Sequence, residues 1–331
     1  MTSNSRSKTL LASLAIATLV SHANPTFPQD SAVSFPSKPI QFIVTSPPGG
    51  SNDVFARAIA KRLTDAFGTP VIVDNRSGAT GSIGAALVAK APADGHTLLM
   101  ISSSFATSAA IQTNLPFDPV KSFAPVAMIG KGPLLLAVSP TLAVATAEDL
   151  FALARSKPGK LNYATSGTGS INHFATELLL DAAGIRMTHV PYKGMGPAIT
   201  DLIAGHVDVL VASAPSMLAQ VKAGKVKGLG VTTALPSAIA PGLPPLARAG
   251  ARDYEVELWW GVVTAAETPK AIVAKLNAEI NKALGSDEMK EFLAREGAEA
   301  LTMTPEAFAA VLRADIERWK KVAKAAAIRP E

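Results

Sequence analysis

Signals for strands and helices alternate along nearly the whole chain, and this alternation restricts its fold more than any other feature. Residues 40–45 form a short apolar run typical of a buried strand. Apolar residues then recur at helical spacing from Val54 to Phe67, and Gly68 followed by Pro70 ends that helix. Repeated strand–helix units predict parallel sheets with helices on both faces, which is an α/β fold.

The same alternation continues toward the end of the chain. Further strands are expected at 71–74, 96–101, 125–129, 134–138, 161–165, 187–191, 207–211, 226–232 and 256–264. Helices are expected at 82–91, after the serines at 102–104, and at 171–183, 197–204 and 215–223, with three more at the C-terminus. Thr146, Thr268 and Thr304 are predicted to cap helices, the last two with proline at the first helical position.

These signals form two sets, which predicts two lobes. The first lobe is expected to comprise residues 36–136 and 255–331, and the second residues 137–254, with the chain crossing between them twice. A chain of 331 residues with 48% hydrophobic and 17% charged residues can bury such cores. Ligands of α/β folds bind beyond the carboxyl ends of the strands, so the expected site is a cleft between the lobes.

Residues 1–23 have the pattern of a secretory signal peptide. Arg6 and Lys8 give a basic start, 10–20 is an apolar run of eleven residues, and 21–23 offers small residues for cleavage. The run is shorter than the ~20 residues that span a bilayer. A buried or membrane-anchoring helix is the alternative; we expect export and a soluble mature protein in the periplasm.

Charge and cysteine content exclude several classes of site. The chain has no cysteine, which excludes disulfides, thiolate metal sites and a cysteine nucleophile. Its formal charge of +5 becomes +3 without Arg6 and Lys8, since 29 basic residues then face 26 acidic ones. No block of Lys and Arg suited to a nucleic-acid backbone is present, so no nucleic-acid partner is expected.

Enzyme motifs are also missing. There is no phosphate-binding G-x-x-x-x-G-K-[ST] loop and no G-x-S-x-G nucleophile elbow. The glycines at 167–169 lack the third glycine of a dinucleotide fingerprint. His96, His173, His189 and His206 do not have the spacing of metal ligands. We therefore expect a protein that is not an enzyme and that uses no cofactor or metal.

Four strand-to-helix junctions carry hydroxyl residues, at 47–52, 77–82, 102–104 and 166–172, and all of them except 102–104 also contain glycine. The first turn of a helix has unpaired N–H groups and a partial positive charge. Such a junction can bind a carboxylate or phosphate without arginine, although turn and cap roles alone are the alternative. Trp259 and Trp260 point to opposite faces of a strand, so one is expected in the core and the other is a candidate for the cleft wall.

A series of motifs resembles the Bug-type receptors of tripartite tricarboxylate transporters. The motifs cover nearly the whole mature chain in order, and their combination is far more specific than any one of them. They lie at 36–40 (PSKPI), 47–54 (PPGGSNDV) with 56–57 (AR), 73–76 (VDNR), 93–99 (ADGHTLL), 115–119 (LPFDP) with 123–125 (FAP), 157–163 (KPGKLNY), 190–194 (VPYKG) and 222–225 (KAGK).

The resemblance implies a two-lobed, type II periplasmic binding protein fold with a cleft between the lobes. Main-chain N–H groups, hydroxyls and ordered waters from both lobes hold a ligand carboxylate in that family. Carried over by position, the first-lobe contacts are Pro48, Gly49, Gly50, Ser51, Asn52, Ser102, Ser103 and Ser104. The second-lobe contacts are Ser166, Gly167, Thr168, Gly169, Ser170, Asn172, His173, Lys193 and Gly194. Asp208 is a further candidate, although a structural carboxylate is the commoner role at such a turn.

Two positions depart from the family pattern. Ala212 and Ser213 stand where many relatives have an Asp-Asn pair, which disfavours a ligand with a free ammonium group. Asn172 stands where relatives often have serine or threonine, so the cargo cannot be copied from the family.

The sequence therefore predicts a monomeric periplasmic solute-binding protein. It would capture a small carboxylate, either a di- or tricarboxylate or an aromatic carboxylate, for the membrane subunits of a tripartite transporter. A ligand sensor that signals to a membrane kinase and a serine hydrolase are the alternatives.

Overall fold

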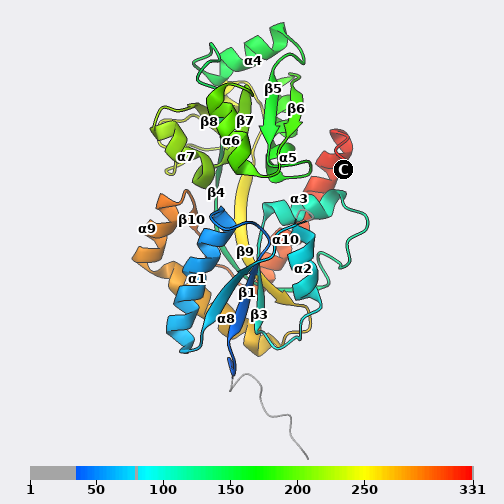
Figure 1. The fold of residues 1–331 in the computed structure, drawn as a ribbon, viewed down its shortest axis with the longest axis vertical. Coiled ribbons are helices and arrows are strands. Elements are labelled where there is room, and N and C mark those ends of the chain that lie inside the picture. The colour runs from blue at the N-terminus through cyan, green and yellow to red at the C-terminus, as the bar shows by residue number, and fades with distance from the viewer. Residues whose placement is uncertain (1–34, 79–80, 330–331) are drawn as a thin grey trace, which may run out of the picture.

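The computed structural model describes residues 35–78 and 81–329, and the α/β fold is confirmed (Figure 1). The signal peptide predicted at 1–23 lies outside the described residues. No helix within the described ranges is long and apolar enough to cross a membrane.

The first half of the sheet is built around β1 (Ile40–Val44). This strand pairs in parallel with β2 (Val71–Asn75) and β3 (Thr97–Ser102), and four of its five residues are buried, as expected for a central parallel strand. Strand β9 (Glu257–Ala265) runs antiparallel between β3 and the long β4 (Phe123–Val138). The two-residue β10 (Glu299–Ala300) also pairs with β4.

The second half of the sheet continues from the other end of β4. There β4 pairs antiparallel with β7 (Val209–Ser213) and β8 (Lys227–Val231). Strand β5 (Asn162–Thr165) lies parallel between β7 and β6 (Thr188–Pro191). The strand predicted at 207–211 is therefore displaced by two residues, so Ala212 and Ser213 belong to β7 itself.

The prediction of two separate strands at 125–129 and 134–138 was wrong, because β4 is one strand of 16 residues. Its Gly130–Pro133 segment looks like a turn in the sequence but pairs with β9 throughout. An added Cβ would lie 2.5 Å from the Glu299 carbonyl oxygen at Gly130 and 2.6 Å from that of Gly297 at Gly132. These glycines let the β10 segment approach β4 closely.

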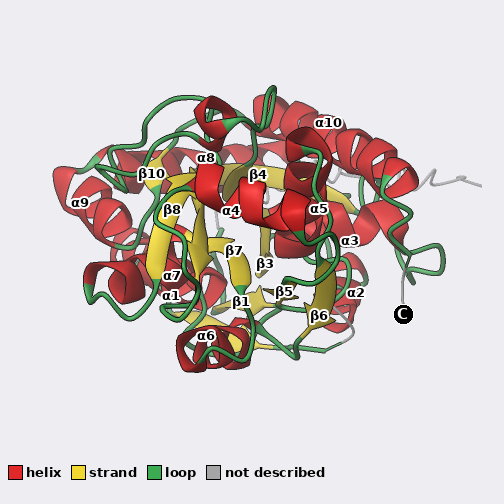
Figure 2. Cartoon of the chain, turned by 90° about the horizontal axis from the view of Figure 1, so that it is seen from above, coloured by secondary structure: helices red, strands yellow, loops and turns green. Residues whose placement is uncertain are grey.

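Helices cover both halves (Figures 1 and 2). The first half carries α1 (Ser51–Phe67), α2 (Ser82–Ala89), α3 (Ser103–Ile111), α8 (Lys270–Gly285), α9 (Asp287–Arg295) and α10 (Pro305–Ala325). The second half carries α4 (Ala147–Ser156), α5 (Ile171–Ala183), α6 (Met195–Ala204), α7 (Ala214–Lys222) and the short 3-10 helix η2 (Leu246–Ala249). Helix α10 contacts both α3 and α5, so it bridges the two halves.

Two of the three predicted caps are confirmed. Thr146 forms a reciprocal capping box with Asp149, and the Thr304 hydroxyl accepts from the Ala307 N–H. Thr268 is not a cap, because its hydroxyl donates to the Ala265 carbonyl and α8 begins only after Pro269.

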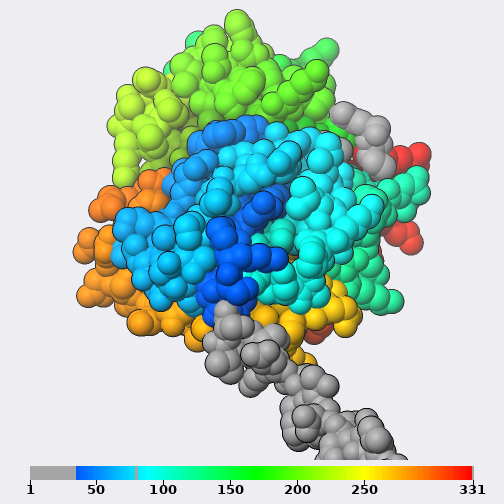
Figure 3. All heavy atoms as spheres, turned by 60° about the horizontal axis from the view of Figure 1, so that its bottom comes forward, coloured from blue at the N-terminus to red at the C-terminus, as the bar shows by residue number. Residues whose placement is uncertain are grey.

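The two halves appear as a lower and an upper lobe in Figure 1, and Figure 3 shows residues of the upper lobe in green above the blue and cyan first lobe. The residue boundaries predicted for the lobes stay a prediction, because β4 belongs to both half-sheets.

Candidate functional site: a cavity at six helix N-termini

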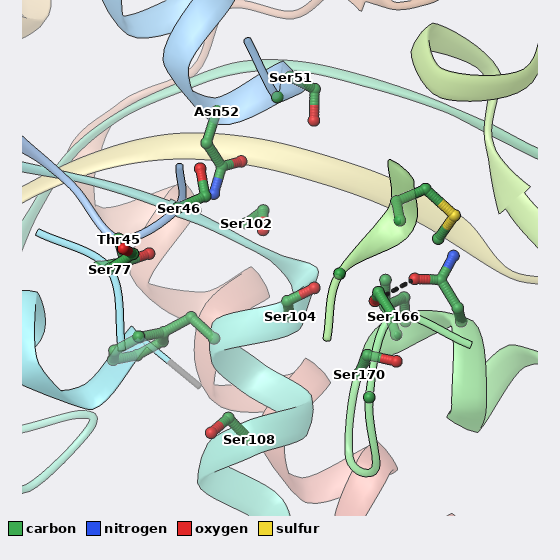
Figure 4. A pocket seen from close by; sticks show the side chains of 18 of the residues that line it. Thr45, Ser46, Ser51, Asn52, Ser77, Ser102, Ser104, Ser108, Ser166 and Ser170 are labelled. Carbon is green, nitrogen blue, oxygen red and sulfur yellow. Dashed lines mark hydrogen bonds between the residues drawn. The ribbon is translucent and has the colours of Figure 1, made fainter. Parts of the chain in front are cut away.

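A cavity of about 690 Å³ lies where the carboxyl ends of β1, β3, β5 and β7 lead into helices. Both halves of the sheet contribute to its lining. Figure 4 shows Ser51, Asn52, Ser102 and Ser104 from the first half around the same space as Ser166 and Ser170 from the second. This is the position where open α/β sheets bind ligands.

The N-cap residues of six helices line this cavity. They are Gly50 of α1, Gly81 of α2, Ser102 of α3, Ser170 of α5, Gly194 of α6 and Ser213 of α7. Only the Ser170 side chain accepts from a backbone N–H of its own helix, and the other five make no such capping bond within the described chain. Six partially positive helix ends therefore converge on one space, which favours an anion.

The lining is rich in hydroxyl groups and poor in charge. Besides the serines above, Thr45, Ser77, Ser82, Ser108 and Thr168 contribute side chains. Among the described residues of the lining, only Lys193 carries a charge. Hydroxyls can donate to an anion and can also hold bridging water.

The loop before α1 is held by the buried carboxylate of Asp53. This carboxylate accepts from the Gly49 N–H at 3.0 Å, from the Asn75 amide at 2.9 Å and from Arg57 at 2.9 Å. Burial by itself raises the pKa of Asp53, but the bonds from Arg57, Gly49 and Asn75 outweigh it and keep the pKa below its usual value. An ionised Asp53 therefore fixes the backbone that places Gly50 and Ser51 at the cavity.

The loop before α5 is held by neutral groups instead. The buried Asn172 side chain accepts from the Ser166 hydroxyl at 2.9 Å and donates to the Val211 carbonyl at 2.8 Å (Figure 4 draws the first bond). The Gly167 N–H donates to the Thr165 hydroxyl, which also bonds the His189 ring. These bonds tie the loop to β5, β6 and β7.

His173 lies beneath this loop. Its Nδ1 accepts from the Gly169 N–H at 3.2 Å, and its ring stacks on His189 with centroids 4.0 Å apart. The bond to Gly169 requires an unprotonated Nδ1. Burial, followed by the charge of His189, lowers the pKa of His173 to about 4. His173 is therefore neutral at pH 7 and supports the loop backbone.

Most of the predicted contact residues line the cavity. They are Gly50, Ser51, Asn52, Ser102, Ser104, Ser166, Gly167, Thr168, Ser170, Asn172, Lys193 and Gly194. Their part in ligand binding stays a prediction.

Six predicted residues are not brought to the cavity wall: Pro48, Gly49, Ser103, Gly169, His173 and Asp208. The Ser103 hydroxyl accepts from the Trp259 N–H inside the core. Asp208 lies at the opposite end of the strands, where it accepts from the Asn162 N–H at 2.8 Å. That bond ties the start of β5 to the start of β7, which is the structural role that a turn carboxylate commonly has.

One tryptophan of the 259–260 pair was predicted as a candidate for the cleft wall, and Trp260 is the one at the cavity. Its indole N–H donates to the Ser51 hydroxyl, whereas Trp259 bonds Asp315. Several other lining residues were not predicted. Phe105, Leu115 and Phe117 form an apolar part of the wall. Leu115 and Phe117 belong to the LPFDP motif at 115–119, but a motif does not show which way its side chains point.

An α/β chain with two half-sheets and an anion-favouring cavity between them has the design of a solute-binding protein. The family model described as "Tripartite tricarboxylate transporter family receptor" matches residues 55–328, and this chain belongs to that family. It is 36% identical to Protein BugT of Bordetella pertussis over 296 residues, which are 89% of this chain and 91% of BugT.

Two solved structures extend the comparison. "R. palustris Rpa4515 with adipate" superposes with a TM-score of 0.85 at 37% identity, covering 90% of this chain and 100% of that one. "MatC (Rpa3494) from Rhodopseudomonas palustris with bound malate" gives a TM-score of 0.80 at 29% identity, covering 87% of this chain and 99% of that one. The Bug-type resemblance predicted from the sequence is confirmed, and the family binds solutes as periplasmic receptors.

Proposed function

We propose that this chain captures a small carboxylate in the periplasm and delivers it to the membrane subunits of a tripartite transporter. The observation that carries the proposal is the convergence of six helix N-termini on one cavity whose described lining has no acidic side chain. Relatives with bound adipate and malate support a carboxylate as the ligand.

Capture would work by closure of the lobes at 36–136 with 255–331 and at 137–254. Three of the N-caps, Gly50, Gly81 and Ser102, belong to the first half, and Ser170, Gly194 and Ser213 belong to the second. An anion that contacts both sets stabilises the closed state, because only that state offers all six helix ends at once.

The lining does not favour a serine hydrolase. A serine nucleophile needs a base within hydrogen-bond reach, and no histidine, aspartate or glutamate is among the described residues that line the cavity. His173, in the first turn of α5, accepts from the Gly169 N–H and is buried.

Ligand-induced thermal stabilisation tests the proposal. Refolded, ligand-free mature protein is heated with citrate, C4–C6 dicarboxylates, benzoate, phthalate and nicotinate, with glucose and phosphate as controls. A carboxylate at ~100 times its Kd adds about 2.7 kcal/mol to the free energy of unfolding. No shift with any acid would overturn the binding role.

The transport role and the location need separate tests. Capture of membrane proteins from the native host with ligand-loaded protein should recover transporter subunits, whereas recovery of a sensor kinase would favour signalling. A fusion of residues 1–23 to a reporter that is active only after export should be active. Size-exclusion chromatography should show a monomer.

A further inference from the structure

We propose that the cavity selects a carboxylate with an apolar, ring-bearing body over a compact di- or tricarboxylate. This inference rests on the proposed function and names the ligand class of the same cavity. It is carried by one wall, formed by Phe105, Ala109, Leu115 and Phe117, which we call the phenyl wall.

The phenyl wall lines the cavity, and its two rings belong to a packed aromatic cluster. Phe105 and Phe117 stack with centroids 6.1 Å apart and an interplanar angle of 10°. Phe123, buried in β4, packs edge-on against Phe105 at 5.6 Å and against Phe117 at 5.4 Å. Because Phe123 packs against both rings and is not part of the cavity lining, the two phenyl groups have contacts that do not depend on a ligand. Both remain half-buried, so part of each ring is open to the cavity.

The side chains of the phenyl wall offer no hydrogen-bond donor to a carboxylate placed against them. On the same helix, α3, the buried Ser108 hydroxyl accepts from the Gln112 amide at 2.8 Å. Burying an ionised group beside apolar side chains without hydrogen bonds is costly. A ring placed there instead removes apolar surface from water and contacts two aromatic side chains.

The rest of the cavity offers the hydrogen-bond donors that a carboxylate needs. Lys193 is the single charged side chain among the described lining residues, and it is exposed to solvent. Hydroxyls and helix N-termini line the rest of the cavity, and Figure 4 shows Ser51, Ser102, Ser104, Ser166 and Ser170 around this space. A ligand with a carboxylate for these donors and a ring for the phenyl wall matches this lining.

Isothermal titration calorimetry with 3-phenylpropanoate, hexanoate, succinate and citrate tests this. We expect 3-phenylpropanoate to bind at least about tenfold more tightly than succinate or citrate, with hexanoate between them. Phe117→Ala should weaken 3-phenylpropanoate about tenfold and change succinate less than about twofold. Phe117→Leu keeps an apolar side chain and should recover most of the affinity for 3-phenylpropanoate. This second variant keeps the test valid if Phe117→Ala does not fold.

Leu235→Ala is the matched control, because Leu235 is 69% exposed and lies outside the cavity lining. The inference is overturned if succinate or citrate binds most tightly, or if Phe117→Ala weakens all four acids equally in a folded protein. If no carboxylate binds the parent protein at all, the proposed function itself fails.

Discussion

The loops before α1 and α5 both present a helix N-terminus to the cavity, but different chemistry holds them. The first depends on an ionised carboxylate, Asp53, paired with the half-exposed Arg57. The second depends on neutral buried groups, chiefly Asn172 and His173. Two loops with the same role are therefore held by a charged network in one case and by neutral groups in the other. The two loops should respond differently to mutation and pH.

The largest difference is expected at glycines with positive φ. Gly49 has φ +84° and Gly169 has φ +79°, but only at Gly169 would an added Cβ meet another side chain, 2.4 Å from Ile111 Cδ1. Gly169→Ala should lower the free energy of unfolding by about 3 kcal/mol, from backbone strain plus overpacking, and should weaken ligand binding.

Gly49→Ala is the matched control, because nothing lies within 4 Å of the added Cβ. Gly49→Ala should lower the free energy of unfolding, measured by urea denaturation, by about 1 kcal/mol, because backbone strain is its only effect. Equal losses in the two variants would show that the contact with Ile111 does not matter.

The next effect is expected at Asn172, whose side chain joins Ser166 to the Val211 carbonyl. Asn172→Leu leaves that buried carbonyl without this donor and should destabilise the protein by about 2 kcal/mol. Asn172→Asp is a second variant of similar size that also removes the amide donor. A change below ~0.5 kcal/mol for both in thermal unfolding would contradict the role given to the amide.

Much of this organisation could be predicted from the sequence. Helix α5 was predicted at its observed bounds, because Ser170 and Gly184 mark its ends and apolar residues fill its length. The continuity of β4 could not be predicted, because Gly130 and Gly132 normally indicate a turn. The backbone that requires glycine at these positions belongs to Gly297 and Glu299, 165 or more residues away. Likewise, the support of Gly169 by His173 depends on packing against His189, which no local pattern shows.

Acid should loosen the second loop before the first. The pKa of His173 is about 4 in the folded protein, below the usual ~6.5 of an unfolded histidine, so the unfolded state binds the extra proton first. The contribution of neutral His173 to the free energy of unfolding is complete above pH ~6.5 and falls as the pH drops toward 4. Between pH 7 and pH 5 we expect a loss of about 2 kcal/mol, measured by urea denaturation.

Other titratable groups face the His173 ring, namely His189, Glu177 and Tyr163, whose hydroxyl donates to Glu177. His173→Gln isolates the contribution of His173, because glutamine can accept from Gly169 but does not titrate. This variant should lose most of the decrease between pH 7 and pH 5. An unchanged decrease would assign it to the neighbouring groups.

The smallest effect is expected at Asp53, because Arg57 is half exposed and Asn retains one acceptor oxygen. Asp53→Asn should cost about 1–2 kcal/mol, from the loss of hydrogen bonds to a charged acceptor. Asp65→Asn, which removes the exposed Lys61–Asp65 pair on the same helix, should cost less than ~0.5 kcal/mol. If Asp53→Asn and Asp65→Asn have the same denaturation midpoint, Asp53 does not hold the loop.

The central claim is that the helix N-termini around the cavity recognise negative charge. Calorimetric titration of ligand-free mature protein with an acid and its uncharged amide, such as adipate with adipamide and 3-phenylpropanoate with its amide, tests this most directly. We predict saturable binding of at least one acid and at least ~100-fold weaker binding of the matching amide, a difference of about 2.7 kcal/mol. Equal binding of acid and amide would contradict the claim.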